Sequence, residues 1–358
     1  MRVASRRFLE QLLAAPSPSG YEAPALTLFA DYIRPYCYVS SDLMGNTYGH
    51  IAGEGENLPT VMLVGHCDEI GLQIKYIDDN GFLYIAAIGG VDAHLTPGKV
   101  VTVHTAQGPI TGVVGKKPIH LMDTKDRETV VKLDAQYIDI GASSKKEADK
   151  IVRVGDCVTF AAGISCLLGD RIASRGLDDK AGAFVVAEVL RLVATRKLRL
   201  PVDLVGVASV QEEVGLRGGT TSAYTVNPDI GICVEVDFAT DQPDVERKHN
   251  GTVTVGGGPI LARGPNINHR LFDELFTAAR RRKIPVQVTA IPRATGTDAN
   301  PMQISRGGTA TALVKLPLRY MHTPVEVCSL GDLEKAAELI VEVLTTMPSR
   351  EAFYPAPV

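Results

Sequence analysis

The chain has 358 residues, 45% of them hydrophobic, which is enough for one large domain with an insertion or for two domains. Its 37 basic and 41 acidic residues leave a formal net charge of -4, so it lacks the field that would hold nucleic acid or an anionic membrane, and no run approaches the roughly 20 apolar residues of a membrane span. Because the six cysteines are scattered and the amino terminus suits an amphipathic helix better than a signal peptide, we expect reduced thiols in a soluble cytoplasmic protein with a small polar or peptidic partner.

The first 71 residues predict helices followed by a buried strand. An amphipathic helix opens the chain, and a second helix is expected near 22–34. The segment PTVMLVGH then predicts a fully buried strand, because it is rich in Val, Leu and Met. His66 stands at the carboxyl end of this strand.

From 72 to 164 the pattern changes to short β-branched runs separated by turn formers such as DDNG and AQG. The predicted strands lie in GLQIKYI, FLYIAAIGG, KVVTVHT, PITGVVG and DCVTFAAG. This pattern predicts a separate β-rich domain inserted at 72–164.

From 165 onward strands and helices alternate again. We expect a helix at 179–197, strands at 202–210 and 230–236, a helix at 269–283, a strand at 309–316 and a helix at 330–346. The predicted fold class is therefore α/β, with one domain formed by 1–71 plus 165–358 and the β-rich insertion between its two parts.

Polar clusters follow the apolar runs at five places. In open α/β sheets the active site lies beyond the carboxyl ends of the strands, so residues in these positions are candidates for a site. The clusters are HCD at 66–68, LDDK at 177–180, QEE at 211–213, VEVD at 234–237 and YMHT at 320–323. Each alone also fits a hydrogen-bonded core histidine or the N-cap of a helix. Together they would bury several unpaired charges, which a pair of divalent metal ions would neutralise.

The spacing of residues in the cluster HCD predicts a different role for each of them. In an extended segment residues i and i+2 share a face, so Asp68 can reach the ring nitrogen of His66 that does not bind metal and orient the imidazole. Cys67 then points to the opposite side, where a packing role is expected. Glu69 is expected to be a solvated or loop acid.

Glu212 and Glu213 can divide the work of a metal site, because one can bind metal while its neighbour accepts a proton from water. Gly215, Gly218 and Gly219 after them predict a tight turn. The alternative for the pair is two solvated charges, which the preceding apolar strand disfavours.

Other site types have little support in the sequence. There is no G-x-S-x-G elbow and no H-E-x-x-H motif. The segments TPGKV and GGGPILARG lack the spacing of phosphate-binding loops. A serine hydrolase, a helix-based zinc protease and a nucleotide enzyme are therefore disfavoured.

Ordered motifs along nearly the whole chain resemble the tetrahedral (TET) aminopeptidases, a family of co-catalytic metallopeptidases that includes glutamyl and deblocking aminopeptidases and proteins once labelled endoglucanases. The motifs are APSPSGYE, VGHCDEIGLQI, IGGVDAHLTPGKVV, GVVGKKPIHL, IASRGLDDKAG, SVQEEVGLRGG, RGPNINHRLFD, GTDANPMQIS and LPLRYMHTPVE. Any one of them is weak, but together in this order they are specific. The resemblance implies an α/β/α metallopeptidase domain with a mixed sheet, and a barrel-like inserted domain that serves oligomerisation.

The resemblance also implies a ligand set for two divalent metal ions, zinc or cobalt, with manganese as a further candidate. Asp178 would bridge the two ions, His66 and Glu235 would complete one position, and Glu213 and His322 would complete the other.

The remaining roles follow from the same resemblance. Glu212 is similar to the family's general base, Asp68 to its orienting acid, and Asp179 to the aspartate that follows the bridging ligand. Many members have aspartate where this chain has Glu235, and Asp237 two residues on is an alternative ligand. We favour Glu235, because its position after ICV matches the register of the motif.

These roles imply amide hydrolysis at the amino terminus of a peptide, with Glu212 accepting a proton from water. The family's hollow tetrahedral dodecamer built from dimers implies a homo-oligomer. Two alternatives stay open, a related amidase acting on a modified amino acid or small amide and a non-catalytic assembly protein. Thr297 and Asp298 are candidates to approach the substrate side chain, and a helix N-cap at either residue is the alternative.

Overall fold

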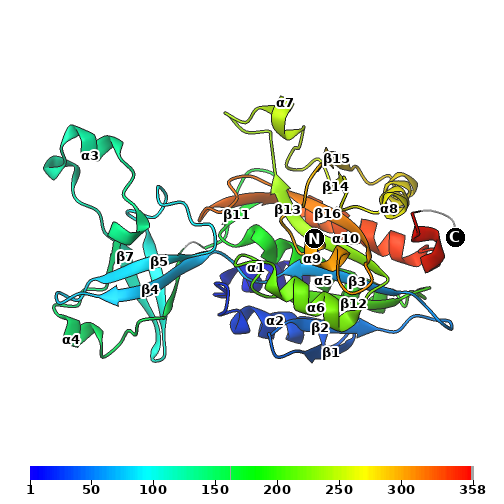
Figure 1. Cartoon of the computed structure of the whole chain (residues 1–358), viewed down its shortest axis with the longest axis horizontal. Coiled ribbons are helices and arrows are strands. Elements are labelled where there is room, and N and C mark those ends of the chain that lie inside the picture. The colour runs from blue at the N-terminus through cyan, green and yellow to red at the C-terminus, as the bar shows by residue number, and fades with distance from the viewer. Residues whose placement is uncertain (162, 356–358) are drawn as a thin grey trace.

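The computed structural model describes residues 1–161 and 163–355, which form an α/β body and a separate β-barrel (Figure 1). The α/β body contains an eight-stranded mixed sheet in the order β1-β2-β12-β3-β13-β16-β14-β15. The barrel, at the left of Figure 1, closes in the order β4-β5-β8-β7-β6-β9. This architecture confirms the predicted α/β fold with a barrel-like inserted domain. In the part of the chain that the structure describes, no helix is long and apolar enough to cross a membrane.

The middle of the large sheet is parallel, because β12, β3, β13 and β16 pair in that orientation. These strands are the ones that the sequence predicts, since a strand buried on both faces is a continuous apolar run. Their carboxyl ends lie at the same edge of the sheet. The strands of the sheet are β1 Tyr38–Ser41, β2 Thr47–Ile51, β3 Thr60–His66, β12 Asp203–Ser209, β13 Ile230–Phe238, β14 Ile260–Arg263, β15 Gln287–Ala290 and β16 Ala310–Leu318.

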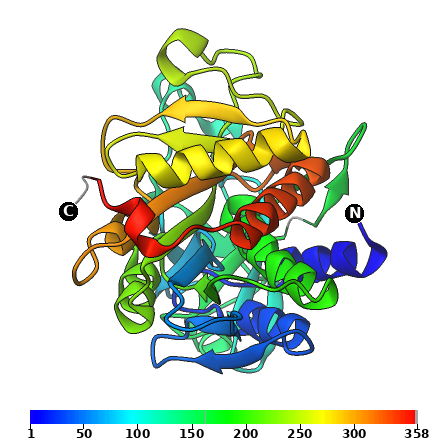
Figure 2. The same ribbon diagram turned by 90° about the vertical axis from the view of Figure 1, so that its right-hand side faces the viewer.

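Helices cover both faces of this sheet (Figures 1 and 2). On one face α5 lies along β3, β12 and β13, with α1, α2 and α10 packed against it and α8 packed against α10. On the other face α6 contacts β12 and β3, and α9 contacts β13 and β16. These helices are α1 Val3–Ala14, α2 Ala23–Ile33, α5 Leu177–Thr195, α6 Arg217–Val226, α8 His269–Arg282, α9 Ala299–Gln303 and α10 Leu330–Thr345.

The barrel strands pair antiparallel around a core of their own. They are β4 Gly71–Ile77, β5 Leu83–Ile88, β6 Val100–Thr105, β7 Gly108–Val114, β8 Tyr137–Asp139 and β9 Cys157–Phe160. Residue 162, in the last predicted run DCVTFAAG, lies outside the described residues. The same part of the chain carries short helices, which are η1 Ile119–Leu121, α3 Thr124–Glu128, η2 Leu133–Ala135 and α4 Lys145–Ala148.

A three-stranded sheet, in the order β10-β11-β17, completes the fold. Its strands are β10 Ser165–Cys166, β11 Arg171–Ser174 and β17 Glu326–Ser329, and the remaining short helices are α7 Arg247–Asn250 and η3 Arg350–Phe353. The sequence analysis did not predict this sheet, because strands this short have too few residues to show a periodic pattern. β11 leads directly into α5, and β17 leads directly into α10.

The predicted tight turn after the paired glutamates is wrong for two of its three glycines. Gly215 has a φ of 119°, as a turn requires, but Gly218 and Gly219 lie inside α6. A Cβ at Gly218 would lie 2.2 Å from the Val210 carbonyl oxygen, and one at Gly219 would lie 2.2 Å from Asp298 Oδ1. The two glycines therefore allow the close packing of α6.

The amino-terminal end of α5 lies against the carboxyl end of β3 without an intervening side chain. A Cβ at Gly65 would lie 2.6 Å from the carbonyl carbon of Gly182, and one at Gly182 would lie 2.2 Å from Oδ2 of Asp179. These two glycines let the acidic first turn of α5 approach His66 at the end of β3.

We expect Gly65→Ala to destabilise the metal-free protein by about 1–3 kcal/mol, because the added methyl group overpacks the contact between β3 and α5. Thermal unfolding would show this as a lower midpoint. Gly307→Ala is the matched control, since Gly307 is exposed and a Cβ there would meet no atom within 4 Å. An unchanged midpoint for Gly65→Ala would contradict the proposed close approach.

Candidate metal centre

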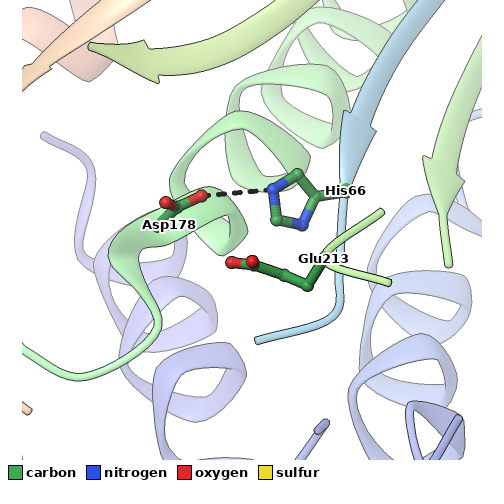
Figure 3. A group of neighbouring side chains, drawn as sticks. All are labelled: His66, Asp178 and Glu213. Carbon is green, nitrogen blue, oxygen red and sulfur yellow. Dashed lines mark hydrogen bonds and ion pairs between the residues drawn. The ribbon is translucent and has the colours of Figure 1, made fainter. Parts of the chain in front are cut away.

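The carboxyl ends of the central strands bring together acids and imidazoles that lie far apart in the sequence (Figure 3). His66 ends β3, and Glu235 lies near the end of β13. Glu213 lies in the loop after β12, and His322 lies in the loop after β16. Asp178 comes from the first turn of α5 and faces His66 (Figure 3).

Asp178 lies between two imidazoles, with one carboxylate oxygen directed to each. Its Oδ1 is 3.1 Å from Nε2 of His66, and its Oδ2 is 3.3 Å from Nε2 of His322. Asp179, which is joined to Asp178 by a cis peptide bond, binds backbone N–H groups instead of imidazoles. Its Oδ2 accepts a hydrogen bond from the His66 backbone N–H at 3.2 Å, and its Oδ1 accepts one from the Gly182 N–H at 3.0 Å. Asp178 is thus the acid with both oxygens directed to imidazoles.

Each imidazole also faces a second carboxylate. Nε2 of His66 is 3.6 Å from Oε1 of Glu235, and Nε2 of His322 is 3.4 Å from Oε1 of Glu213. Apart from Asp178, the closest pairs at Nε2 are thus His66 with Glu235 and His322 with Glu213. Asp178 contacts both imidazoles. Each pair has one imidazole nitrogen and one further carboxylate.

Two overlapping triads have their donor atoms within 4.8 Å of one another, namely His66 with Asp178 and Glu213, and His66 with Asp179 and Glu235. These triads share His66 rather than Asp178. We favour Asp178 as the shared ligand, because both oxygens of Asp179 already accept backbone hydrogen bonds.

The second nitrogen of each imidazole is held by an acceptor. Nδ1 of His66 lies 3.3 Å from Oδ1 of Asp68 and 3.1 Å from the Asp68 carbonyl oxygen. Nδ1 of His322 lies 3.0 Å from the carbonyl oxygen of Gly90, in the loop after barrel strand β5. These acceptors leave Nε2 of each ring as the nitrogen for a metal ion. Because Gly90 belongs to the part of the chain that forms the barrel, the barrel contributes to the site.

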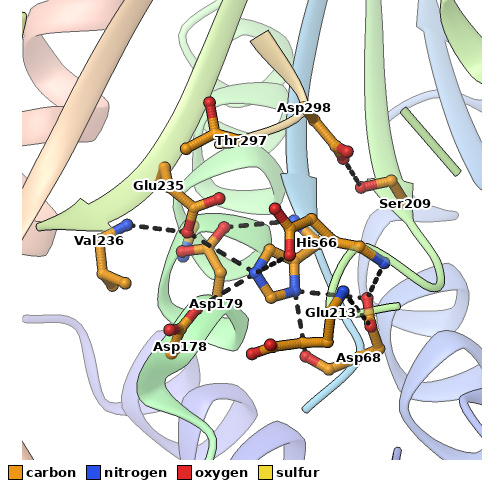
Figure 4. Close-up of polar contacts among 12 residues, drawn as sticks. His66, Asp68, Asp178, Asp179, Ser209, Glu213, Glu235, Val236, Thr297 and Asp298 are labelled. Carbon is orange, nitrogen blue, oxygen red and sulfur yellow. Dashed lines mark hydrogen bonds and ion pairs between the residues drawn. The ribbon is translucent and has the colours of Figure 1, made fainter. Parts of the chain in front are cut away.

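Asp68 also holds the loop that carries the paired glutamates (Figure 4). Its Oδ1 accepts a hydrogen bond from the Glu212 backbone N–H at 3.0 Å. Its Oδ2 accepts from the Glu213 N–H at 3.1 Å and from Oγ of Ser19 at 2.7 Å. One buried carboxylate thus connects His66 with both glutamates.

Carboxylates outnumber cations in this cluster, and their pKa values reflect the imbalance. Burial, reinforced by Asp178, raises the pKa of Glu213 to about 8, and burial raises the pKa of Glu235 well above its usual range. Burial also opposes the ionisation of Asp178, but hydrogen bonds with His322 and His66 outweigh it and hold the pKa at about 2. Divalent cations would supply the missing positive charge, and imidazole nitrogens with carboxylate oxygens suit zinc, cobalt or manganese. The donor set therefore fits the metals that the resemblance implies.

Glu235 is better placed than Asp237 to be the terminal ligand. Oδ2 of Asp237 pairs with Nζ of Lys315 at 2.9 Å, and its Oδ1 accepts from the Phe238 backbone N–H at 2.9 Å. Glu235 also accepts a hydrogen bond from the next backbone N–H, that of Val236 at 3.0 Å. Among the described residues, however, it has no basic partner like Lys315, and its Oε1 lies 3.6 Å from Nε2 of His66. The geometry thus favours the residue that the motif register indicates.

A cavity of about 330 Å³ opens onto the cluster, and its walls include Phe238, Thr297 and Met321. Asp298, the predicted substrate contact, is fully buried and is not part of the cavity wall. Its Oδ2 accepts a hydrogen bond from Oγ of Ser209 at 2.5 Å (Figure 4). Thr297 therefore lies at the cavity wall, whereas Asp298 lies behind it.

The expectation that Glu69 is a solvated or loop acid is wrong. Its side chain is buried and forms ion pairs with Arg175 and Lys180, and Lys180 is itself fully buried. The two basic residues flank the acidic pair in RGLDDK, which was the available signal. Cys67 has the expected packing role, since it lies in the core, where burial raises the pKa of its thiol to about 12.

The sequence analysis did not select Glu326, which is buried next to the cluster. Its carboxylate accepts hydrogen bonds from the backbone of both Asp178 and His322. Glu326 follows His322 by four residues in HTPVE, so an acid inside a ligand motif was the available signal.

Comparisons with known proteins relate the chain to aminopeptidases. A family model described as M42 glutamyl aminopeptidase matches residues 45–339. The lysyl aminopeptidase of Pyrococcus furiosus is 36% identical over 346 residues, which cover 95% of this chain and 97% of the relative. The crystal structure of a TET aminopeptidase from the marine sediment archaeon Thaumarchaeota archaeon SCGC AB-539-E09 matches with a TM-score of 0.91 and 31% identity, over 96% of each chain. The Pyrococcus horikoshii TET1 peptidase, which can assemble into a tetrahedron or a large octahedral shell, matches with a TM-score of 0.85 and 30% identity, over 95% of this chain and 99% of that chain.

We expect chelation to lower the thermal unfolding midpoint and added Zn²⁺ or Co²⁺ to restore it. An ion that binds the folded chain at 100 times its Kd stabilises it by about 2.7 kcal/mol. Differential scanning calorimetry of chelator-treated protein, with and without each ion, measures the effect. If neither ion moved the midpoint, the cluster would not be a metal site.

Proposed function

The chain belongs to the M42 glutamyl aminopeptidase family and is therefore a hydrolase acting on peptide bonds, and we propose that it removes amino-terminal residues from peptides by means of two divalent metal ions and the general base Glu212. The observation that carries this proposal is the placement of Asp178. One of its carboxylate oxygens faces His66 and the other faces His322, as a residue shared by two ions requires.

Five side chains would hold the ions. Asp178 would bridge them, His66 and Glu235 would complete one position, and Glu213 and His322 would complete the other. Divalent ions bound at such a site polarise the scissile carbonyl and lower the pKa of water. We propose zinc or cobalt as the ions. A cytoplasmic location of the protein stays a prediction.

Glu212 is the proposed base because it lies at the cluster without being one of the five ligands. Its Oε2 is 3.8 Å from Nε2 of His66, and its side chain lines the cavity. Burial, with a further contribution from Asp298, raises its pKa to about 7 although His66 opposes this shift. A carboxylate with a pKa near neutrality can accept a proton from water and return it to the leaving amine.

The acidic lining of the cavity also supports a preference for a free amino terminus. Glu212, Glu213 and Glu235 all contribute to its wall. A protonated amine entering this space gains attraction from any carboxylate that a metal ion does not neutralise. An acylated amine has no such charge.

We also propose that the chain forms a homo-oligomer. The support is its likeness to the Pyrococcus horikoshii TET1 peptidase over nearly the whole length of both chains. We propose that dimers assemble into a tetrahedral dodecamer. The barrel is the part of the chain that we expect to serve oligomerisation.

A panel of amino-acid 4-nitroanilides, each with a free and an acetylated amine, tests the proposed activity in the presence of Co²⁺ or Zn²⁺. We expect turnover of free substrates only. Bound metal without turnover of any member would favour an amidase for small amides, and absence of both would favour an assembly protein.

We expect Glu212→Gln to lose about 10²–10⁴-fold in kcat while binding metal almost as well as the unchanged chain, because general acid-base catalysis contributes that much. Steady-state kinetics and atomic emission on the same sample give both quantities. Near-normal turnover with two bound ions would remove Glu212 from the role of base.

Asp178→Ala should lose bound metal and activity together, since it removes the carboxylate shared by both positions. Metal content after equilibrium dialysis measures this directly. Retention of two ions by the variant would contradict the assignment of Asp178 as the bridge.

A further inference from the structure

Glu326 is a buried acid beside the metal ligands that does not line the cavity. Its side chain is 2% exposed, and it begins β17, which pairs with β11 on the chain segment leading into α5. Among the described residues no basic side chain forms an ion pair with it. A buried carboxylate is costly unless its oxygens are hydrogen-bonded, so the contacts that it makes explain why it is tolerated.

The two oxygens of Glu326 bind the backbone of two proposed ligands. Oε2 accepts a hydrogen bond from the Asp178 N–H at 3.1 Å, and Oε1 accepts one from the His322 N–H at 2.9 Å. One carboxylate thus joins the first turn of α5 to the loop after β16. The side chains of the same two residues also meet, since Oδ2 of Asp178 lies 3.3 Å from Nε2 of His322.

His322 is the ligand that depends most on such a contact. Its side chain is 35% exposed, whereas that of His66 is 2% exposed, so packing restrains it less. Its φ of 61° is in the left-handed region that a non-glycine residue rarely adopts. Its ring contacts Gly90, Asp178 and Glu213, and the hydrogen bond from its backbone N–H to Glu326 restrains the main chain at this position.

We propose that Glu326 is a positioning residue that fixes the distance between Asp178 and His322, and so sets the affinity of the metal position formed by Asp178, Glu213 and His322. Among the described residues, the Glu326 side chain forms no hydrogen bond or ion pair with His66 or Glu235. The proposal rests on the two-metal function proposed above. Loss of a residue that orients ligands in this way typically weakens metal binding 10–100-fold.

Glu326→Gln is the main variant. Glutamine keeps the volume of the side chain but has one acceptor oxygen, and its NH₂ group faces the second backbone N–H. Either Asp178 or His322 therefore loses its hydrogen-bond acceptor. Glu326→Asp keeps both acceptor oxygens on a shorter side chain, so it should recover part of the affinity.

Asp332→Asn is the matched control. Asp332 is also buried, and its two oxygens accept hydrogen bonds from the backbone N–H groups of Gly256 and Gly258 at 2.6 and 2.8 Å. It lies in the first turn of the neighbouring helix α10, where its Oδ1 is 3.6 Å from Nζ of Lys335. Among the described residues it forms no hydrogen bond or ion pair with a proposed ligand. A purely structural role for Glu326 would make the two variants behave alike.

The experiment titrates Co²⁺ into the chelator-treated full chain by calorimetry, with the bound ions counted after equilibrium dialysis. We expect two ions in the unchanged chain and in Asp332→Asn. Glu326→Gln should bind one ion normally and the second 10–100-fold more weakly, with Glu326→Asp in between. Thermal midpoints recorded on the same samples show whether the two buried-acid variants are comparably destabilised.

The proposal would be overturned if Glu326→Gln and Glu326→Asp bound both ions with unchanged affinity, or if Asp332→Asn weakened the second ion equally. Should Glu326→Gln fail to fold, Glu326→Asp against Asp332→Asn decides the question. Fewer than two ions in the unchanged chain would be a different result, because it would overturn the proposed two-metal function itself.

Discussion

Asp178 directs one carboxylate oxygen to His66 and the other to His322, while Glu213 and Glu235 approach the same two imidazoles from either side. Burial, reinforced by repulsion from the neighbouring carboxylates, raises the pKa values of both glutamates. Positive charge held among these groups removes the conflict. We propose two cations rather than one, because Oδ1 of Asp178 faces His66 and Oδ2 faces His322.

Strand pairing and the close approach of α5 to the sheet bring the residues of this cluster together. Parallel pairing of β12, β3, β13 and β16 places their carboxyl ends at one edge of the sheet. Gly65 and Gly182 then allow α5 to approach that edge closely enough for its first turn to join the cluster. Asp68 binds the N–H groups of the glutamate loop, and Glu326 binds those of Asp178 and His322. Acids outside the proposed ligand set thus bind the backbone of the proposed ligands.

Much of this arrangement is predictable from the sequence, because buried parallel strands are continuous apolar runs and their carboxyl ends are where sites form. That pattern selects the five polar clusters, and the family resemblance assigns the proposed ligands within them. The burial of Glu69 was not predictable in the same way, since its partners Arg175 and Lys180 lie about a hundred positions along the chain. Glu326 stands inside the motif HTPVE, but its hydrogen bonds to the backbone of Asp178 and His322 depend on tertiary contacts that the motif does not show. The glycines of α6 were misassigned to a turn because the contacts that require them are tertiary.

The most direct test of the account is a crystal structure of the protein loaded with Zn²⁺ or Co²⁺, with anomalous diffraction recorded at the absorption edge of that metal. We expect two anomalous peaks, one beside each carboxylate oxygen of Asp178, with His66 and Glu235 at the first and Glu213 and His322 at the second. Absence of anomalous density between Asp178 and the two imidazoles would contradict the central claim.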